Sequence, residues 1–259
     1  MSMKPRRFNP AQLRYDKNWV PVLSPQQITD IAAEVLERFC PVVLKVPRST
    51  PVVEIIQELS KSTGLKFAYT DLGHKDGHKV LGKVSFGEKL LSLDPVLQKE
   101  LEPAFRFTAA HEIGHWVLHR YKYKLWTFLK KNKELDDDDA SLFRLIDKSP
   151  LEWLEYQANF FAAELVMPRA QFEQAVAAAQ HRLGIRRNLG KIYLSSAGSQ
   201  LDLVQVLEEL ERVYSVSRAA LRIRMKTLEI LVEPPKRSSR LMDVAPEPVG
   251  FTKDNNFPF

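Results

Sequence analysis

Residues 106–120, RFTAAHEIGHWVLHR, contain an H-E-x-x-H pattern that begins at His111 and ends at His115. An α-helix advances about 100° per residue, so these two histidines lie about 40° apart on one face, one turn from each other. Two imidazoles in this arrangement can both reach one tetrahedral metal ion. Glu112 can then reach a water on that ion without binding the ion itself. The stretch therefore predicts a helix with two metal ligands, His111 and His115, and a catalytic base, Glu112.

The opposite side of this predicted helix is apolar. With His111 placed at 0°, six apolar side chains fall in an arc from about 120° to 260° by the 3.6-residue period. They are Phe105, Ala109, Ala110, Ile113, Trp116 and Val117. One side of the helix is thus expected to pack against the protein while the other presents ligands to a cleft.

A third histidine, His119, lies on roughly the same face but about 12 Å of helix rise from His111. Ligand atoms around one zinc ion must lie within about 4 Å of each other, so a continuous helix cannot supply all three rings. No glycine between His115 and His119 lets the chain turn back. We interpret His119 as a packing residue or as a neighbour of a ligand.

Residues 151–168, LEWLEYQANFFAAELVMP, predict a second helix that can supply the missing ligand. Glu155 shares a face with Asn159, and small side chains on or beside that face would let the helix approach the histidine helix closely. Those small residues are Ala158, Ala162 and Ala163. Glu155 is therefore the predicted third ligand. Glu152, about 60° around the helix, is the alternative, and Glu164 lies on the far side.

The rest of the chain predicts further helices and one small sheet. A helix begins at Pro25 after the N-cap Ser24, and other helices are expected at 51–62, 95–120, 141–146, 150–167, 168–183, 199–213 and 217–231. Short β-prone runs between Lys66 and Asp94, separated by glycine and aspartate, predict a small antiparallel sheet. The proline-containing ends, 1–24 and 233–259, are expected to be irregular.

Composition narrows the class of protein. The 259 residues are 44% hydrophobic and 27% charged, which is typical of a folded chain and unlike a disordered one. The single cysteine, Cys40, excludes an intrachain disulfide framework and favours a reducing compartment. No run of about 18 apolar residues is present, so we expect no membrane span. The N-terminus lacks the apolar region of a secretory signal, and we expect a cytoplasmic protein.

The two helical segments together, RFTAAHEIGHWVLH and EYQANFFAAELVMP, resemble the ImmA/IrrE family of zinc metallopeptidases over roughly residues 25–232. The resemblance implies zinc bound by His111, His115 and Glu155, with Glu112 as catalytic base. It also implies a mostly helical, zincin-like α+β domain. Related enzymes often carry aspartate four residues after the glutamate ligand, where it orients a zinc-bound histidine. This chain has Asn159 there, whose amide oxygen can still accept the imidazole N–H.

The same resemblance implies an endopeptidase that cleaves a helix-turn-helix repressor, and so a role in transcription regulation and stress response. We expect the zincin-like domain at 25–183 and a C-terminal helical, helix-turn-helix-like module at 184–232. Two imidazoles and one carboxylate also accommodate Mn²⁺ or Fe²⁺. Residues 79–93 are the expected edge strand for an extended substrate. No oxyanion-stabilising residue can be assigned, although Tyr156, His181 and Tyr193 are candidates.

The net charge of +6 leaves a different class of function open. Basic surfaces attract nucleic acid, and the predicted helix at 217–231 carries Arg218, Arg222 and Arg224. The chain could then be a DNA- or protein-binding regulator with a structural or inactive metal site. The charge is dispersed along the sequence, however, and the basic helix is expected to pack in a bundle, which favours the peptidase.

Overall fold

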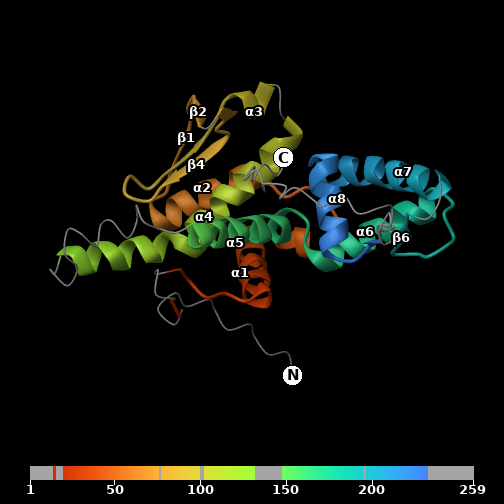
Figure 1. The fold of residues 1–259 in the computed structure, drawn as a ribbon, viewed down its shortest axis with the longest axis horizontal. Coiled ribbons are helices and arrows are strands. Elements are labelled where there is room, and N and C mark those ends of the chain that lie inside the picture. The colour runs from red at the N-terminus through yellow and green to blue at the C-terminus, as the bar shows by residue number, and fades with distance from the viewer. Residues whose placement is uncertain are drawn as a thin grey trace, which may run out of the picture.

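The computed structural model describes residues 14–15, 20–75, 77–99, 102–131, 148–194 and 197–232. These ranges are mostly helical with short strands, which confirms the α+β class (Figure 1). The helices are α1 (Pro25–Phe39), the 3-10 helix η2 (Pro41–Leu44), α2 (Val52–Thr63), α3 (Val96–Lys99), α4 (Glu102–Lys131), α5 (Lys148–Val166), α6 (Arg169–Arg182), α7 (Ala197–Tyr214) and α8 (Arg218–Thr227). The strands are β1 (Lys66–Tyr69), β2 (His74–Lys75), β3 (His78–Lys79), β4 (Gly82–Ser85), β5 (Leu90–Leu93), β6 (Ile192–Tyr193) and β7 (Leu231–Val232). The helix expected at 141–146 lies outside the described residues.

Helix α1 begins where the sequence predicts. The Ser24 hydroxyl accepts the Gln27 N–H at 3.2 Å, and the Gln27 side chain accepts the Ser24 N–H at 2.8 Å. This reciprocal capping satisfies two amides that the first helical turn leaves unpaired, and Pro25 occupies the first helical position. The buried face of α1 consists of Ile28, Ile31, Ala32, Val35 and Leu36. Within the described ranges, no helix is long and apolar enough to cross a membrane.

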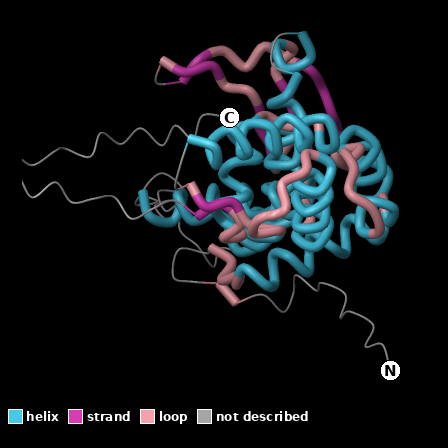
Figure 2. Tube along the Cα trace, turned by 90° about the vertical axis from the view of Figure 1, so that its right-hand side faces the viewer, coloured by secondary structure: helices cyan, strands magenta, loops and turns pink. Residues whose placement is uncertain are grey.

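The main sheet is mixed, so the prediction of an antiparallel sheet is wrong for one of its two pairings. Its strand order is β1-β5-β4, with β5 parallel to β1 and antiparallel to β4. Strand β5 carries Leu91 and Leu93, both fully buried, and therefore takes the central position. Because β5 inserts between two strands that run in opposite directions, one of its pairings must be parallel. The short β2–β3 pair lies outside this sheet, and Figure 2 shows the strands at the edge of a helical body.

The histidine helix extends beyond its predicted C-terminal bound. Helix α3 is described up to Lys99 and α4 from Glu102, and α4 continues past residue 120 to Lys131. No glycine or proline stands between His115 and Ser149, so local sequence gives α4 no reason to end at residue 120. Helix α5 crosses α4, and Gly114 lies at the contact. A Cβ at Gly114 would be 3.1 Å from the Ala158 carbonyl oxygen, so the missing side chain permits the close approach.

The C-terminal helices α6, α7 and α8 lie together beside α5 (Figure 1). Helix α8 ends at Thr227, short of the predicted residue 231, because Glu229 adopts a left-handed backbone with φ of 56°. The chain then extends as β7, which pairs in parallel with β6. The helix-turn-helix character expected for 184–232 is not confirmed.

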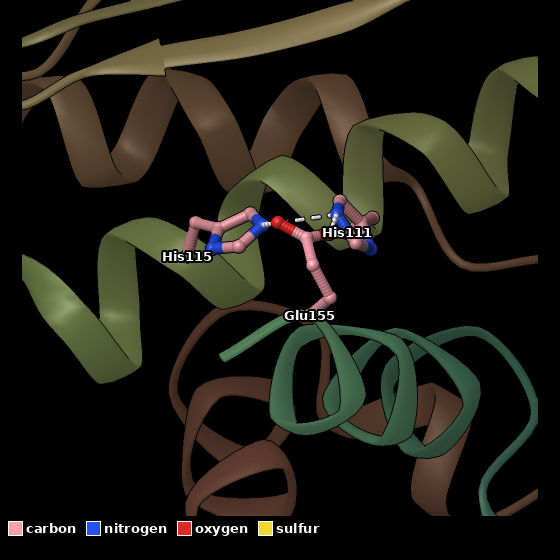
Figure 3. Close-up of side chains that lie close together, drawn as sticks. All are labelled: His111, His115 and Glu155. Carbon is pink, nitrogen blue, oxygen red and sulfur yellow. Dashed lines mark hydrogen bonds and ion pairs between the residues drawn. The ribbon is translucent and has the colours of Figure 1, made fainter. Parts of the chain in front are cut away.

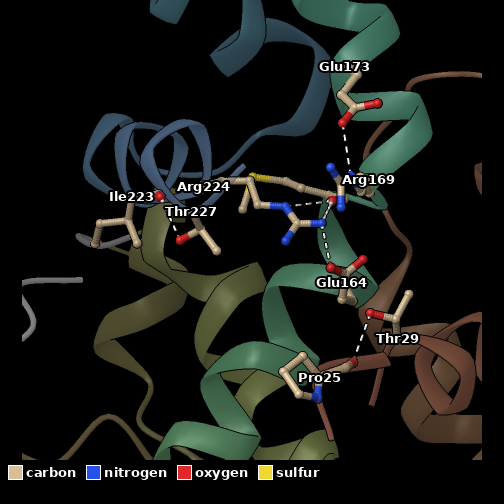
Figure 4. A network of polar contacts seen from close by, with 9 residues as sticks. Pro25, Thr29, Glu164, Arg169, Glu173, Ile223, Arg224 and Thr227 are labelled. Atoms are coloured by element: carbon tan, nitrogen blue, oxygen red, sulfur yellow. Dashed lines mark hydrogen bonds and ion pairs between the residues drawn. The ribbon is translucent and has the colours of Figure 1, made fainter. Parts of the chain in front are cut away.

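A buried ion pair attaches α8 to the end of α5 (Figure 4). The Arg224 side chain is 1% exposed, and its Nη2 lies 2.9 Å from Glu164 Oε1. Its Nε and Nη2 also donate to the Met167 carbonyl oxygen at 3.1 and 2.9 Å. Burial lowers the pKa of Arg224, and the carboxylate of Glu164 counteracts that shift. The two charges therefore depend on each other.

Replacing Arg224 with Met would leave the Glu164 carboxylate buried without a partner. We expect R224M to lower the free energy of unfolding by about 3–5 kcal/mol, measured by urea denaturation. The double variant E164M/R224M should recover much of that loss, because apolar side chains can fill the space. The control is R212M, which removes an exposed arginine. A loss in R224M no larger than in R212M would contradict the importance of the buried pair.

Candidate metal centre

Helix α4 presents two imidazoles toward one point. His111 and His115 lie one turn apart, their Nε2 atoms are 3.0 Å apart, and both rings are mostly buried. The apolar arc predicted for the opposite side of α4 packs inward, with Ala109, Ala110, Ile113, Trp116 and Val117 buried and Phe105 half-buried. One side of the helix is therefore packed in the core, and the other side presents both rings.

Glu155 reaches these rings from α5 (Figure 3). Its Oε2 lies 3.1 Å from His111 Nε2, and its Oε1 lies 3.4 Å from His115 Nε2. The alternative ligand, Glu152, is exposed to solvent, and Glu164 is engaged with Arg224. Of the three glutamates considered from sequence, Glu155 alone is brought to the histidines.

The spacing of the three donors fits a metal ion. Within the described residues, His111, His115 and Glu155 form a cluster whose possible ligand atoms all lie within 4.8 Å of one another. A tetrahedral zinc ion with bonds of about 2.0–2.1 Å separates its ligand atoms by about 3.3 Å. The distances of 3.0, 3.1 and 3.4 Å among these side chains match the edges of such a tetrahedron. The donor set and its size therefore suit zinc.

The electrostatics of the cluster favour a positive charge at its centre. Burial raises the pKa of Glu155, but hydrogen bonds from His111 and His115 lower it by more, so it lies far below its usual range. Burial lowers the pKa of His111, but Glu155 and the charge of Glu112 raise it by more. Both shifts stabilise the pairing of carboxylate with cation.

The outer ring nitrogens are held by the surrounding helices. His111 Nδ1 lies 2.9 Å from the Asn159 amide oxygen, the contact expected for this amide. His115 Nδ1 lies 3.1 Å from His119 Nδ1. His119 is 3% exposed and contacts a ring of the cluster. It therefore neighbours a candidate ligand, one of the two roles expected for it. The inner Nε2 atoms remain directed toward Glu155.

Glu112 lies beside the cluster, where burial raises the pKa of its carboxyl group and the charges of the nearby histidines lower it by less. Gly82, a residue of strand β4, lies next to Glu112 and was not identified from the sequence. A Cβ at Gly82 of β4 would be 2.6 Å from Glu112 Oε1. A glycine within a strand pattern often marks the close approach of another group, so the signal was present in the sequence.

Strand β4 forms the edge of the described sheet next to Glu112. The Asp94 N–H donates to the Leu81 carbonyl at 2.8 Å, which makes these two residues a hydrogen-bonded pair. Such pairs alternate along an antiparallel ladder. The peptide groups of Gly82 and Val84 therefore point away from β5, toward the open edge.

No evidence in the described part of the chain supports Tyr156, His181 or Tyr193 as the residue that stabilises the oxyanion. Tyr156 stacks on Trp153 with ring centroids 5.0 Å apart, and both side chains are exposed. His181 lies near the end of α6, and Tyr193 lies in β6. The three candidates therefore lie on three different elements. Sequence reasoning also missed Gln157, a fully buried amide that contacts His119.

Comparison with known proteins gives a family match and distant structural likenesses. None of the curated proteins matches this chain. A solved structure described as a Mycobacterium tuberculosis transcriptional regulator matches with 10% sequence identity and a TM-score of 0.43. The match covers 78% of this chain and 51% of that one, so this chain spans about half the length of that regulator.

The family model for the IrrE N-terminal-like domain, peptidase M78, matches residues 61–226. That range covers the main sheet, the two crossed helices with His111, His115 and Glu155, and most of the C-terminal helices. The match extends over more than half of the sequence. The chain therefore belongs to the peptidase M78 family of IrrE N-terminal-like proteins.

Proposed function

We propose that this chain is a metal-dependent endopeptidase, with zinc as the preferred ion. The observation that carries the proposal is the convergence of His111, His115 and Glu155 within 4.8 Å, with the buried Glu112 beside them. Zinc bound by these three residues would lower the pKa of a water molecule and polarise the carbonyl of a peptide bond. Manganese and iron remain compatible with the same donors.

Glu112 is the proposed general base. A carboxylate whose pKa is raised by burial is a stronger base than an exposed one. Glu112 takes a proton from the attacking water and later donates it to the leaving amine nitrogen. The water oxygen forms a bond to the peptide carbon as the carbon–nitrogen bond breaks. Glu155 cannot replace Glu112, because its hydrogen bonds to the histidines stabilise its charge.

The substrate is proposed to bind as an extended strand along β4. The outward peptide groups of Gly82 and Val84 can pair with a substrate backbone, as in β-augmentation. Gly82 has no side chain, so a paired substrate would lie close to Glu112. This placement brings the scissile bond and the proposed base to the same edge of the sheet.

The proposed substrate is a helix-turn-helix repressor in the cytoplasm, whose cleavage would derepress genes. This step rests on the family resemblance. The alternative, a DNA- or protein-binding regulator, would use the arginines of α8. Arg224 is buried, however, and Arg218 forms ion pairs with Glu211 at 2.9 Å and Glu208 at 3.4 Å. These contacts reduce the positive charge that α8 offers to DNA.

Replacing Glu112 with Gln tests the enzymatic proposal directly. Incubated with a candidate helix-turn-helix repressor from the same genome, the zinc-loaded chain should release a defined fragment, and a chelator should prevent it. We expect E112Q to keep its zinc but to cleave at least about 100-fold more slowly, since general-base catalysis contributes about 10²–10⁴-fold. Unchanged regulation of the target genes by E112Q would favour the regulator instead.

Replacing Glu155 with Gln tests the third ligand, with E152Q as a matched control on the same helix. Zinc at about 100 times its Kd should stabilise the unchanged chain by about 2.7 kcal/mol, or roughly 5–10 °C in Tm. Differential scanning calorimetry should show most of this shift lost in E155Q, because a neutral amide binds zinc weakly, and kept in E152Q. Equal shifts in the two variants would remove Glu155 from the proposed ligand set.

Replacing Gly82 with Ala tests the contact between β4 and the base. The new Cβ would lie 2.6 Å from Glu112 Oε1, so the flexible carboxylate must move. We expect cleavage to fall by about 100-fold, the usual cost of misplacing a reacting group by about 1 Å, while zinc affinity is kept. K83A, which shortens an exposed neighbour in β4, is the control. Full activity in G82A would show that the contact is dispensable.

A further inference from the structure

A chain of buried hydrogen bonds leads from His115 to the backbone of the N-terminal segment. His119 Nδ1 lies 3.1 Å from His115 Nδ1, and His119 Nε2 lies 3.1 Å from the Gln157 amide oxygen. The Gln157 amide nitrogen donates to the Pro21 carbonyl oxygen at 2.7 Å. His119 is 3% exposed and Gln157 is fully buried, so water cannot substitute for these partners.

The direction of every bond in this chain follows from its far end. A backbone carbonyl can only accept, so Gln157 must present its NH₂ group to Pro21 and its oxygen to His119. A neutral His119 must then carry its proton on Nε2, which leaves a lone pair on Nδ1. His115 must donate from its own Nδ1 to that lone pair. The only tautomer of neutral His115 that satisfies this series of hydrogen bonds has an unprotonated Nε2.

We propose that His119 and Gln157 are positioning residues that hold His115 in the tautomer and orientation required of a metal ligand. The inference rests on the proposed metal site, because the unprotonated Nε2 is the atom that faces His111 and Glu155. His119 acts through His115 and touches neither metal nor substrate.

The two histidine ligands are thus oriented by different means. His111 is held by one amide, Asn159, on the same helix as Glu155. His115 is held by a relay of two side chains that ends on another segment. Pro21 itself is fixed, since it forms a β-bridge with Tyr15 and since the Val22 N–H donates to the Arg14 carbonyl at 2.9 Å. The N-terminal segment therefore supports the metal centre.

Two substitutions at His119 separate its two hydrogen bonds. In H119N the amide oxygen stands near the position of Nδ1 and can accept from His115. In H119Q the amide reaches the position of Nε2, so the contact with Gln157 is kept and the acceptor for His115 is lost. We expect H119Q to weaken zinc affinity by about 10–100-fold, the usual cost of losing an outer contact of a ligand, and H119N to weaken it less. Competition with a chromophoric zinc chelator measures both.

A double-mutant cycle tests whether the two residues act as one unit. Q157M alone should weaken zinc affinity, and H119Q/Q157M should lose no more than H119Q, because both changes break the same relay. The control is Q180M, which removes another buried glutamine that bonds the backbone of Gly190 and Lys191. Q180M should lower the Tm of the metal-free chain without changing zinc affinity.

The absorption spectrum of bound Co²⁺ reports on the ligand geometry directly. We expect H119Q and Q157M to shift that spectrum and Q180M to leave it unchanged. Equal zinc affinity in H119N and H119Q, or an unchanged cobalt spectrum in H119Q, would overturn the proposal. These measurements do not depend on cleavage. If the protein binds zinc as described but cleaves no substrate, the proposed activity is refuted and the positioning role still stands.

Discussion

The close crossing of α4 and α5 is the constraint on which the candidate site depends. Two candidate ligands lie on one helix and the third on the other, so the cluster exists only if the two backbones approach closely. Gly114 and Ala158 permit this approach, because a Cβ on Gly114 would press against the Ala158 backbone. Glu155 and Asn159 flank that contact and meet the rings of α4. Packing of two small residues thus determines the geometry of a charged cluster.

The carboxyl groups of Glu155 and Glu112 have pKa values shifted in opposite directions, because their surroundings differ. Glu155 is bonded to two imidazoles and remains ionised, while Glu112 is buried beside a glycine and its pKa is raised. Opposite shifts in one site are typical of a division between binding and proton transfer. Helix α4, which carries two of the proposed ligands, therefore also carries the proposed base.

Much of the site was predictable because it depends on short-range periodicity. The spacing of His111 and His115 predicts a shared helix face, and the alanines around Glu155 predict a closely packed partner. The parts that were missed depend on contacts distant in sequence. Gln157 and Pro21 are 136 residues apart, and no local pattern relates them. The parallel pairing in the sheet was missed for a similar reason, because the position of β5 between β1 and β4 depends on the burial of Leu91 and Leu93.

The salt link between Arg224 and Glu164 has an evolutionary consequence. Its two partners belong to the helix that carries Glu155 and to α8, the last helix among the described residues, and a buried charge is costly without its partner. Recombination could not exchange α6, α7 and α8 together between relatives unless the residue at position 164 changed with them. Divergence of the two halves of this protein is therefore expected to be coupled.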